Sequence, residues 1–251
     1  MQKKIQSAPT IFYPESDGKP MAETDKHRDL MIDFILMLRH HYRNENDVYV
    51  SGNLLMYYEE GNPRKSISPD VFVVFGVAKK QRDTYLTWEE AHTPDFVLEV
   101  ASPSTFNRDM GRKKDLYASV LKVKEYYIYD PLGEIVPSFI GYRLTDGIYQ
   151  EINFVNERLS SSVLGLELGE HGNELRLYDP KTSQWLQTPP ERAENAEIRA
   201  ENAEIRAENA ETRVQEEASA RRNAETRAEN AEAALAKALA ALERFEAEEN
   251  N

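Results

Sequence analysis

A seven-residue repeat near the C-terminus constrains this chain more than any other feature. RAENAEI, RAENAEI and RAENAET follow one another from Arg192, and looser copies continue to Phe245. This segment has no Gly or Pro after Pro190, whereas all 11 glycines, all 12 prolines and both tryptophans precede it. The pattern predicts one helix of about 90 Å at the usual rise of 1.5 Å per residue. We therefore expect a compact domain, residues 1–188, followed by a helical element, residues 189–251.

The repeat gives this helix a seam of small side chains at heptad positions a and d. The seam consists of Ala193, Ala196, Ala200, Ala203, Ala207, Ala210, Val214, Ala224, Ala228, Ala231, Leu235, Ala238, Leu242 and Phe245. Arg at position g and Glu at position e flank most copies. Such a helix either forms a coiled coil that makes the chain a homo-oligomer, or stays a solvated single helix held by charge pairs. Alanine knobs bury little area, so self-association should be weak.

Composition excludes several classes of protein. The chain has no cysteine, which removes disulfide scaffolds, thiolate zinc sites, iron–sulfur centres and cysteine nucleophiles. No run of about 18 apolar residues is present, and the N-terminal MQKKIQSAPT has no apolar stretch behind its lysines. We therefore expect a cytoplasmic protein without a membrane partner.

Net charge is −13, of which the segment 191–251, with 9 basic and 16 acidic residues, carries −7. The rest of the chain carries the remaining −6, which argues against a basic protein that coats DNA. Local basic patches could still contact phosphates, because such contacts depend on the charge near the groove. The basic clusters are Arg64-Lys65, Lys79-Lys80-Arg82 and Arg108-Arg112-Lys113-Lys114.

The first periodic segment, MAETDKHRDLMIDFILMLRHHY, predicts an amphipathic helix. Apolar residues recur every three or four positions from Leu30 to Tyr42, and Thr24 or Asp25 is placed to cap the helix. Extending the buried stripe towards the N-terminus reaches His27 and then Glu23. Two ionisable residues thus occupy the inward phase at the helix start.

The following segments predict an α/β (α+β) fold, with a mixed sheet flanked by helices. Strand patterns, one further helix and a closing strand occur in the order DVYVSG, NLLMYYEEG, SPDVFVVFG, PDFVLEVAS, FNRDMGRKKDLYASVLKV and EYYIYDP. VFVVF is apolar throughout, which indicates a central strand covered on both faces. Hairpin-like pieces between Phe139 and Asp179 should extend the same domain in antiparallel fashion. In the second helix, Leu116, Tyr117, Val120 and Leu121 should face inward.

Three charged residues in this domain suggest chemistry. Asp70 opens the apolar strand VFVVF, and Glu99 sits inside VLEVAS, where an uncompensated carboxylate would cost several kcal/mol. Lys113 has the inward phase of the second helix. Two carboxylates on neighbouring strands with an amine alongside would form a hard-cation site for Mg²⁺ or Mn²⁺. Glu23 could add another carboxylate.

Long stretches of the domain resemble the bacterial Uma2 family of endonucleases, a branch of the PD-(D/E)xK superfamily. The motifs PESDGKPMAETDKHRDLMIDF, VYVSGNLLMYYEEGNPRKSISPDVFVVFG and PDFVLEVASPSTFNRDMGRKKDLYASVLKVKEYYIYDPLG occur in order over roughly residues 10–180. The resemblance implies a restriction-endonuclease-like core. It also implies that Asp70, Glu99, Lys113 and Glu23 are the catalytic residues, with Asp109 as a weaker fifth.

One departure from the superfamily pattern affects the lysine. Ala101 stands two residues after Glu99, where a lysine is expected. We expect Lys113 to supply the ammonium group from the helix instead. Its neighbour Lys114 is a competitor, because it too lies one helical turn from Tyr117.

The sequence therefore favours a Mg²⁺- or Mn²⁺-dependent endonuclease that hydrolyses DNA phosphodiester bonds. In this hypothesis Asp70 and Glu99 bind the metal, Lys113 assists the attacking water, and Glu23 supports the site. The alternative is a catalytically silent nuclease fold that binds or assembles, with the C-terminal helix setting its oligomeric state. The target sequence, and whether RNA can replace DNA, are left open.

Overall fold

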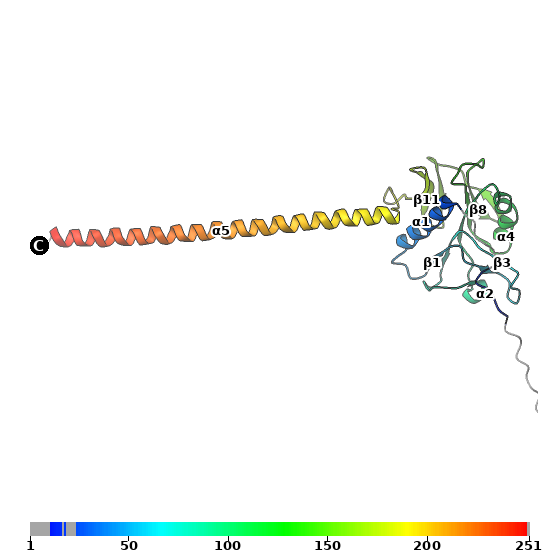
Figure 1. Ribbon diagram of the computed structural model, residues 1–251, viewed down its shortest axis with the longest axis horizontal. Coiled ribbons are helices and arrows are strands. Elements are labelled where there is room, and N and C mark those ends of the chain that lie inside the picture. Colours follow the sequence, from blue (N-terminus) through cyan, green and yellow to red (C-terminus); the bar gives the residue numbers. More distant parts are fainter. Residues whose placement is uncertain (1–10, 17, 19–23, 250–251) are drawn as a thin grey trace, which may run out of the picture. The chain divides into compact units, whose positions relative to one another are not determined.

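The computed structural model describes residues 11–16, 18 and 24–249 and separates into two units, Met1–Pro190 and Glu191–Asn251. The first unit holds the strands and the shorter helices (Figure 1). The second belongs to the helix α5 (Pro189–Glu249), which has 61 residues and is exposed from residue 196 to residue 241. The predicted long C-terminal helix is therefore confirmed. Among the described residues, no helix combines the length and the apolar character needed to cross a bilayer.

A six-stranded mixed sheet forms the centre of the first unit. Its order is β1 (Val48–Ser51), β4 (Val71–Phe75), β6 (Phe96–Val100), β7 (Glu125–Tyr129), β8 (Phe139–Thr145) and β9 (Ile148–Glu151). The β6 and β7 strands are parallel, and the other neighbouring pairs are antiparallel. The helical crossover between β6 and β7 produces the parallel pair, as expected for a β-helix-β connection. The predicted mixed sheet is confirmed.

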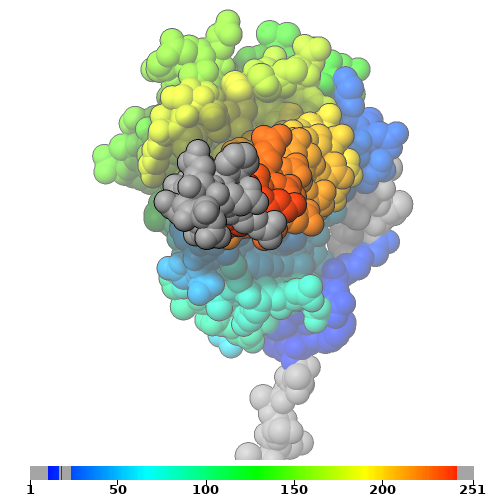
Figure 2. Space-filling model, turned by 90° about the vertical axis from the view of Figure 1, so that its left-hand side faces the viewer, coloured from blue at the N-terminus to red at the C-terminus, as the bar shows by residue number. Residues whose placement is uncertain are grey.

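One face of this sheet packs against the helix α1 (Asp25–His41) and a second sheet. That four-stranded sheet consists of β10 (Arg158–Ser161), β11 (Leu166–His171), β12 (Glu174–Asp179) and β13 (Gln184–Trp185). Val71 and Val73 of β4 belong to this core. The surface of the second sheet, yellow-green in Figure 2, is a separate region from the cyan surface of the N-terminal half.

The other face is covered by the helix α4 (Lys114–Ser119) and a small sheet. This sheet contains β3 (Ser66–Ile67), β2 (Met56–Tyr57) and β5 (Tyr85–Leu86), and the short helix α2 (Thr87–Glu90) follows it. Phe72 and Val74 lie in this second core, so successive residues of β4 enter opposite cores. The apolar character of VFVVF reflects burial on both faces, as predicted.

The first helix matches its prediction in detail. Thr24 is the N-cap, and its side chain accepts a hydrogen bond of 3.3 Å from the backbone N–H of His27. Leu30, Phe34 and Leu38 are buried against the sheet. The cap and the stripe of apolar residues fix the rotation of the helix, which directs His27 towards Asp70, just before the start of β4.

The second predicted helix is interrupted. It consists of α3 (Phe106–Arg108), a π-helical turn η1 (Asp109–Lys113) and α4. Tyr117 and Leu121 are buried as expected, but Val120 is 50% exposed, so its predicted inward position is wrong. The helix α4 ends at Ser119, and the N–H groups of Val120 and Leu121 both bond to the Leu116 carbonyl, a closing turn in which Leu121 is buried and Val120 is exposed.

Candidate active site

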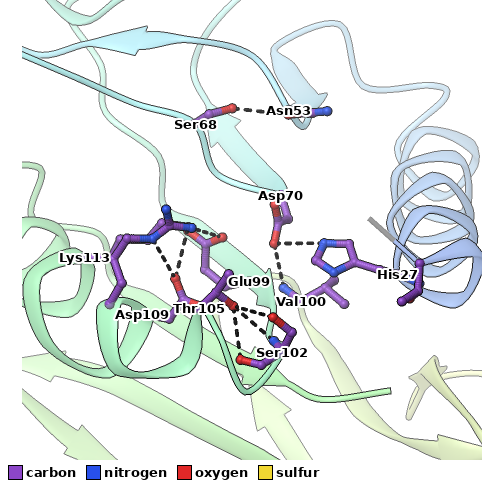
Figure 3. A network of polar contacts seen from close by, with 12 residues as sticks. His27, Asn53, Ser68, Asp70, Glu99, Val100, Ser102, Thr105, Asp109 and Lys113 are labelled. Carbon is purple, nitrogen blue, oxygen red and sulfur yellow. Dashed lines mark hydrogen bonds and ion pairs between the residues drawn. The ribbon is translucent and has the colours of Figure 1, made fainter. Parts of the chain in front are cut away.

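Strand pairing brings the two predicted carboxylates together. In the antiparallel β4–β6 pair, Val71 lies opposite Leu98 and Phe72 lies opposite Val97. Continuing this register by one residue places Asp70 opposite Glu99. The Glu99 side chain extends from the face that α4 covers, because Glu99 shares the parity of Val97. The Asp70 carboxylate lies just before β4, between the Val100 N–H and His27 of α1. In Figure 3 the Asp70 carboxylate is turned towards His27 and Val100, and that of Glu99 towards Lys113.

Asp70 is held by the ends of two other elements. Its Oδ2 accepts a hydrogen bond of 2.8 Å from the backbone N–H of Val100, and it lies 3.6 Å from Nε2 of His27 (Figure 3). The backbone of Asp70 also touches Gly52, where a Cβ atom would lie 2.0 Å from the Asp70 carbonyl oxygen. Gly52 is therefore required for the close approach of the end of β1 to Asp70.

Glu99 is fully buried and has two close partners. Its Oε2 lies 2.8 Å from Nζ of Lys113, and its Oε1 accepts a hydrogen bond of 2.6 Å from the hydroxyl of Tyr117. Lys113 Nζ also lies 3.2 Å from Oδ1 of Asp109. One ammonium group is thus shared between two buried carboxylates, as the dashed lines in Figure 3 indicate.

The π-helical turn decides which lysine enters the site. Asp109, Lys113 and Tyr117 are spaced four residues apart, and all three side chains turn towards β6. Lys114 instead places its Nζ 3.6 Å from the centre of the Tyr142 ring. Single π turns inside helices often occur at functional sites. Here the turn carries the lysine that contacts Glu99.

The electrostatics of the cluster are unbalanced. Burial raises the pKa of Glu99 to about 8, the carboxylates of Asp70 and Asp109 add to this increase, and Lys113 opposes it. Burial lowers the pKa of Lys113, but the three carboxylates outweigh burial and raise it above its usual value. Burial also raises the pKa of Asp70, yet His27, Lys113 and the Val100 N–H together hold the pKa of this carboxyl below its usual value.

Three carboxylates around one ammonium group leave an excess of negative charge, which suits a hard cation. Glu99 Oε2 and Asp109 Oδ1 are buried without a hydrogen bond among the described residues, and Lys113 contacts both only as an ion pair. In the described part of the chain, no group of three or more acidic or histidine side chains is arranged to hold a metal. Mg²⁺ is commonly held by one or two carboxylates, with water and substrate phosphate as its other ligands. Asp70 and Glu99 fit that donor set.

The cluster has a buried side and a side that reaches solvent. The side chains of Glu99 and Asp109 are at most 2% exposed, whereas those of Lys113, His27 and Asp70 are 12–16% exposed. A phosphate group would therefore meet Asp70, His27 and Lys113 first. Glu99 lies beneath them and fixes the ammonium group of Lys113.

The structure brings together Asp70, Glu99, Lys113 and Asp109 of the residues proposed from the sequence. Glu23 lies outside the described residues. Two further members were not assigned a role from the sequence. His27 was placed in the inward phase of the first helix, and Tyr117 was taken as a core residue. A buried tyrosine whose hydroxyl needs a partner was the available signal for Tyr117.

Comparison with protein-family models matches residues 7–171 to the model Uma2, described as "Putative restriction endonuclease". The chain belongs to the Uma2 family. The match covers the central sheet and the whole cluster around Glu99, so the predicted resemblance is confirmed.

Among solved structures, the chain is similar to a protein from Anabaena variabilis ATCC 29413, described as a "putative nuclease belonging to DUF820". The two share 14% sequence identity with a TM-score of 0.42, over 60% of this chain and 81% of the other. Comparison with curated proteins gives no match.

Proposed function

We propose that this Uma2 protein is a Mg²⁺- or Mn²⁺-dependent endonuclease that hydrolyses phosphodiester bonds in DNA. One observation carries the proposal: Asp70 and Glu99, from adjacent strands, converge with the ammonium group of Lys113 at 2.8 Å from Glu99. Acidic oxygens beside one amine suit a divalent cation and an anionic transition state. Membership of a nuclease-like family supports the same reaction class.

In this proposal Asp70 and Glu99 hold the cation. A divalent cation in such a site polarises a phosphoryl oxygen and makes water a better nucleophile near neutral pH. Lys113 donates hydrogen bonds to the phosphoryl oxygens, whose negative charge increases as water attacks phosphorus and the P–O bond breaks. Its ammonium group is held in place by Glu99 and Asp109 on either side.

Three neighbours act as positioning residues. The N–H of Val100 and the ring of His27 orient the carboxylate of Asp70. Burial raises the pKa of Tyr117 well above its usual value, so its hydroxyl stays protonated and donates to Glu99. These contacts keep the carboxylate of Asp70 open towards substrate and fix that of Glu99 beneath it.

The helix α5 also belongs to the proposal. We propose that its alanine seam allows weak self-association, which would make the protein a homo-oligomer in the cytoplasm. The support for this is the heptad pattern of the sequence and the exposure of the helix from residue 196 to residue 241. Catalysis does not depend on this part of the proposal, because every residue of the cluster lies in the first unit.

Cleavage of supercoiled plasmid DNA by the full chain with Mg²⁺ tests the function. Asp70→Asn keeps the size of the side chain but removes its charge, and should abolish cleavage. Lys113→Met should do the same, while the matched control Lys114→Met should retain it, because Lys114 contacts Tyr142 instead of the carboxylates. Equal cleavage by wild type and Asp70→Asn would refute the proposal. Absence of cleavage and of millimolar Mg²⁺ or Mn²⁺ binding would favour the silent nuclease fold.

A further inference from the structure

A groove of about 570 Å³ runs along the edge strand β1, outside the cluster described above. One wall is the C-terminal end of α1, with Arg39, and the residues that follow it, with Arg43. The other wall is the loop of residues 79–83. All four residues of β1 line the groove between these walls. It therefore follows the strand along its length.

The groove is basic although the protein is acidic. It is lined by Arg39, Arg43, Lys79, Lys80 and Arg82, with Asp83 as the acidic residue in its lining. The chain as a whole has a net charge of −13. Even when Glu90, the partner of Arg82 and Lys80, is counted with Asp83, five cations face two carboxylates. A surplus of positive charge in a concave surface attracts a polyanion.

Some of these cations are fixed and others are available to a ligand. Arg82 is 4% exposed at its side chain, pairs with Glu90 at 2.7 Å, and lies 4.1 Å above the Tyr49 ring. In the described part of the chain, no carboxylate forms an ion pair with Arg39, Arg43 or Lys79, and all three are exposed. Arg43 Nη1 donates to the His40 carbonyl at 3.0 Å and Lys79 Nζ donates to the Tyr42 carbonyl, so both cations have backbone partners while their charges are not neutralised by a carboxylate.

The strand β1 connects this groove to the carboxylates. It ends at Ser51, and the next residue, Gly52, lies against the carbonyl of Asp70. The N–H of Asn53 then donates a hydrogen bond of 2.8 Å to the carbonyl of Pro69. Four strand residues span about 14 Å. One strand of B-DNA rises about 3.4 Å per nucleotide, so this length corresponds to about four nucleotides.

We propose that the β1 groove binds the backbone phosphates of the DNA substrate, about four nucleotides from the bond that is cleaved. The identity of the ligand as DNA rests on the proposed function. Arg43 and Lys79 contact phosphates from the two walls, and Arg39 contacts them near the middle of β1, where its Nε donates to the Val50 carbonyl at 3.0 Å. These contacts are independent of base sequence and set the path of the strand towards Asp70.

Binding of fluorescent duplex DNA to the full chain, measured by anisotropy in EDTA, tests the groove without catalysis. The double variant Arg43→Glu/Lys79→Glu should bind at least tenfold more weakly than wild type. Loss of two phosphate contacts should also reduce the slope of log K against log [salt] by about 2. Arg64→Glu/Lys65→Glu is the matched control, because it changes the net charge equally on an exposed loop outside the groove. Circular dichroism and thermal unfolding verify that both variants fold.

Several results would overturn the inference. These are unchanged affinity and salt slope in Arg43→Glu/Lys79→Glu, equal losses in the control variant, and displacement of DNA by inorganic phosphate at constant ionic strength. The last result would assign the groove to a free anion. In plasmid cleavage, the groove variant should lose activity through KM rather than kcat.

Failure of the groove and failure of the proposed function give different results. If the groove variant loses binding but no protein cleaves DNA, the inference stands as DNA binding and the nuclease proposal fails. If wild type cleaves and Asp70→Asn does not, while the groove variant binds and cleaves normally, the nuclease proposal stands and the groove inference fails.

Discussion

Glu99 and Glu125 lie on the adjacent parallel strands β6 and β7, and both are fully buried, yet their surroundings differ. Glu125 faces the second sheet and accepts hydrogen bonds from Arg143, Ser161 and both the backbone and the hydroxyl of Ser162. Glu99 faces α4. Its partners are the ammonium group of Lys113 and the hydroxyl of Tyr117.

The difference shows that burial of a carboxylate is not by itself a sign of catalysis. Glu125 has enough donors for both oxygens and joins two sheets, so its charge is satisfied within the fold. Glu99 shares one ammonium group with Asp109 and lies beside Asp70, so acid exceeds base around it. The shortage of positive charge, rather than depth, distinguishes the candidate site.

The largest expected effect is on cleavage. Glu99→Gln keeps the shape of the side chain but removes a proposed metal ligand and the partner of Lys113. We expect cleavage of plasmid DNA to fall by at least about 1000-fold, equivalent to roughly 4 kcal/mol of transition-state stabilisation. Initial rates with saturating Mg²⁺ measure this. Glu125→Gln, assayed below its unfolding temperature, is the control and should stay within about tenfold of wild type. Equal losses in both variants would remove the functional distinction.

The next largest effect is on stability, where we expect Glu125 to matter and Glu99 not to. Glu125→Gln leaves Arg143 without its carboxylate and disrupts the hydrogen bonds to Ser161 and Ser162. It should lower the free energy of unfolding by about 3 kcal/mol. Glu99→Gln, measured without metal, should leave stability unchanged or increase it, because it removes repulsion among three carboxylates. Urea unfolding monitored by tryptophan fluorescence measures the free energy of unfolding of both variants. A larger loss in Glu99→Gln would show that Glu99 is the structural residue.

A smaller effect concerns pH. The pKa of Glu99 is raised to about 8 by burial, so the native state binds this proton more tightly than the unfolded state, where the pKa is ordinary. The stability that this proton provides is present below about pH 4.5 and is lost as pH rises towards 8. In EDTA, the stability of Glu99→Gln relative to wild type should therefore increase as the pH rises through this range, by on the order of 1 kcal/mol or more. A difference that is constant between pH 5 and pH 8 would contradict this.

The smallest expected effect is that of removing α5 on cleavage and on stability. A chain that ends at Pro190 keeps both clusters, since their residues precede that position. Its cleavage rate at saturating DNA and its free energy of unfolding should match those of the full chain within about 0.5 kcal/mol. Sedimentation should show association in the full chain alone. Identical sedimentation of the two would favour a solvated single helix.

The sequence predicted the carboxylates of the site more successfully than it predicted their surroundings. Asp70 and Glu99 stood out as charges at the start of, and within, apolar strands, and helical phase favoured Lys113 while leaving Lys114 as a competitor. His27 was placed inward but without a partner, because its contact with Asp70 depends on how α1 crosses the sheet. The π turn was not visible in the pattern of residues. Glu125 was not singled out at all, since its partners Ser161 and Ser162 follow more than 30 residues later.

By itself, the sequence determined the family, the sheet-forming segments and the long terminal helix, because these follow from periodicity and from motifs that are continuous along the chain. Only the tertiary structure decided which charged groups meet. The opposition of Asp70 and Glu99 depends on strand register, the choice of Lys113 over Lys114 on a π turn, and the alignment of basic groups along β1 on the packing of α1 beside a distant loop. The strand register and the basic groove depend on contacts between residues far apart in the chain, which local periodicity does not specify, whereas the π turn is a local departure from helical periodicity that the residue pattern did not reveal.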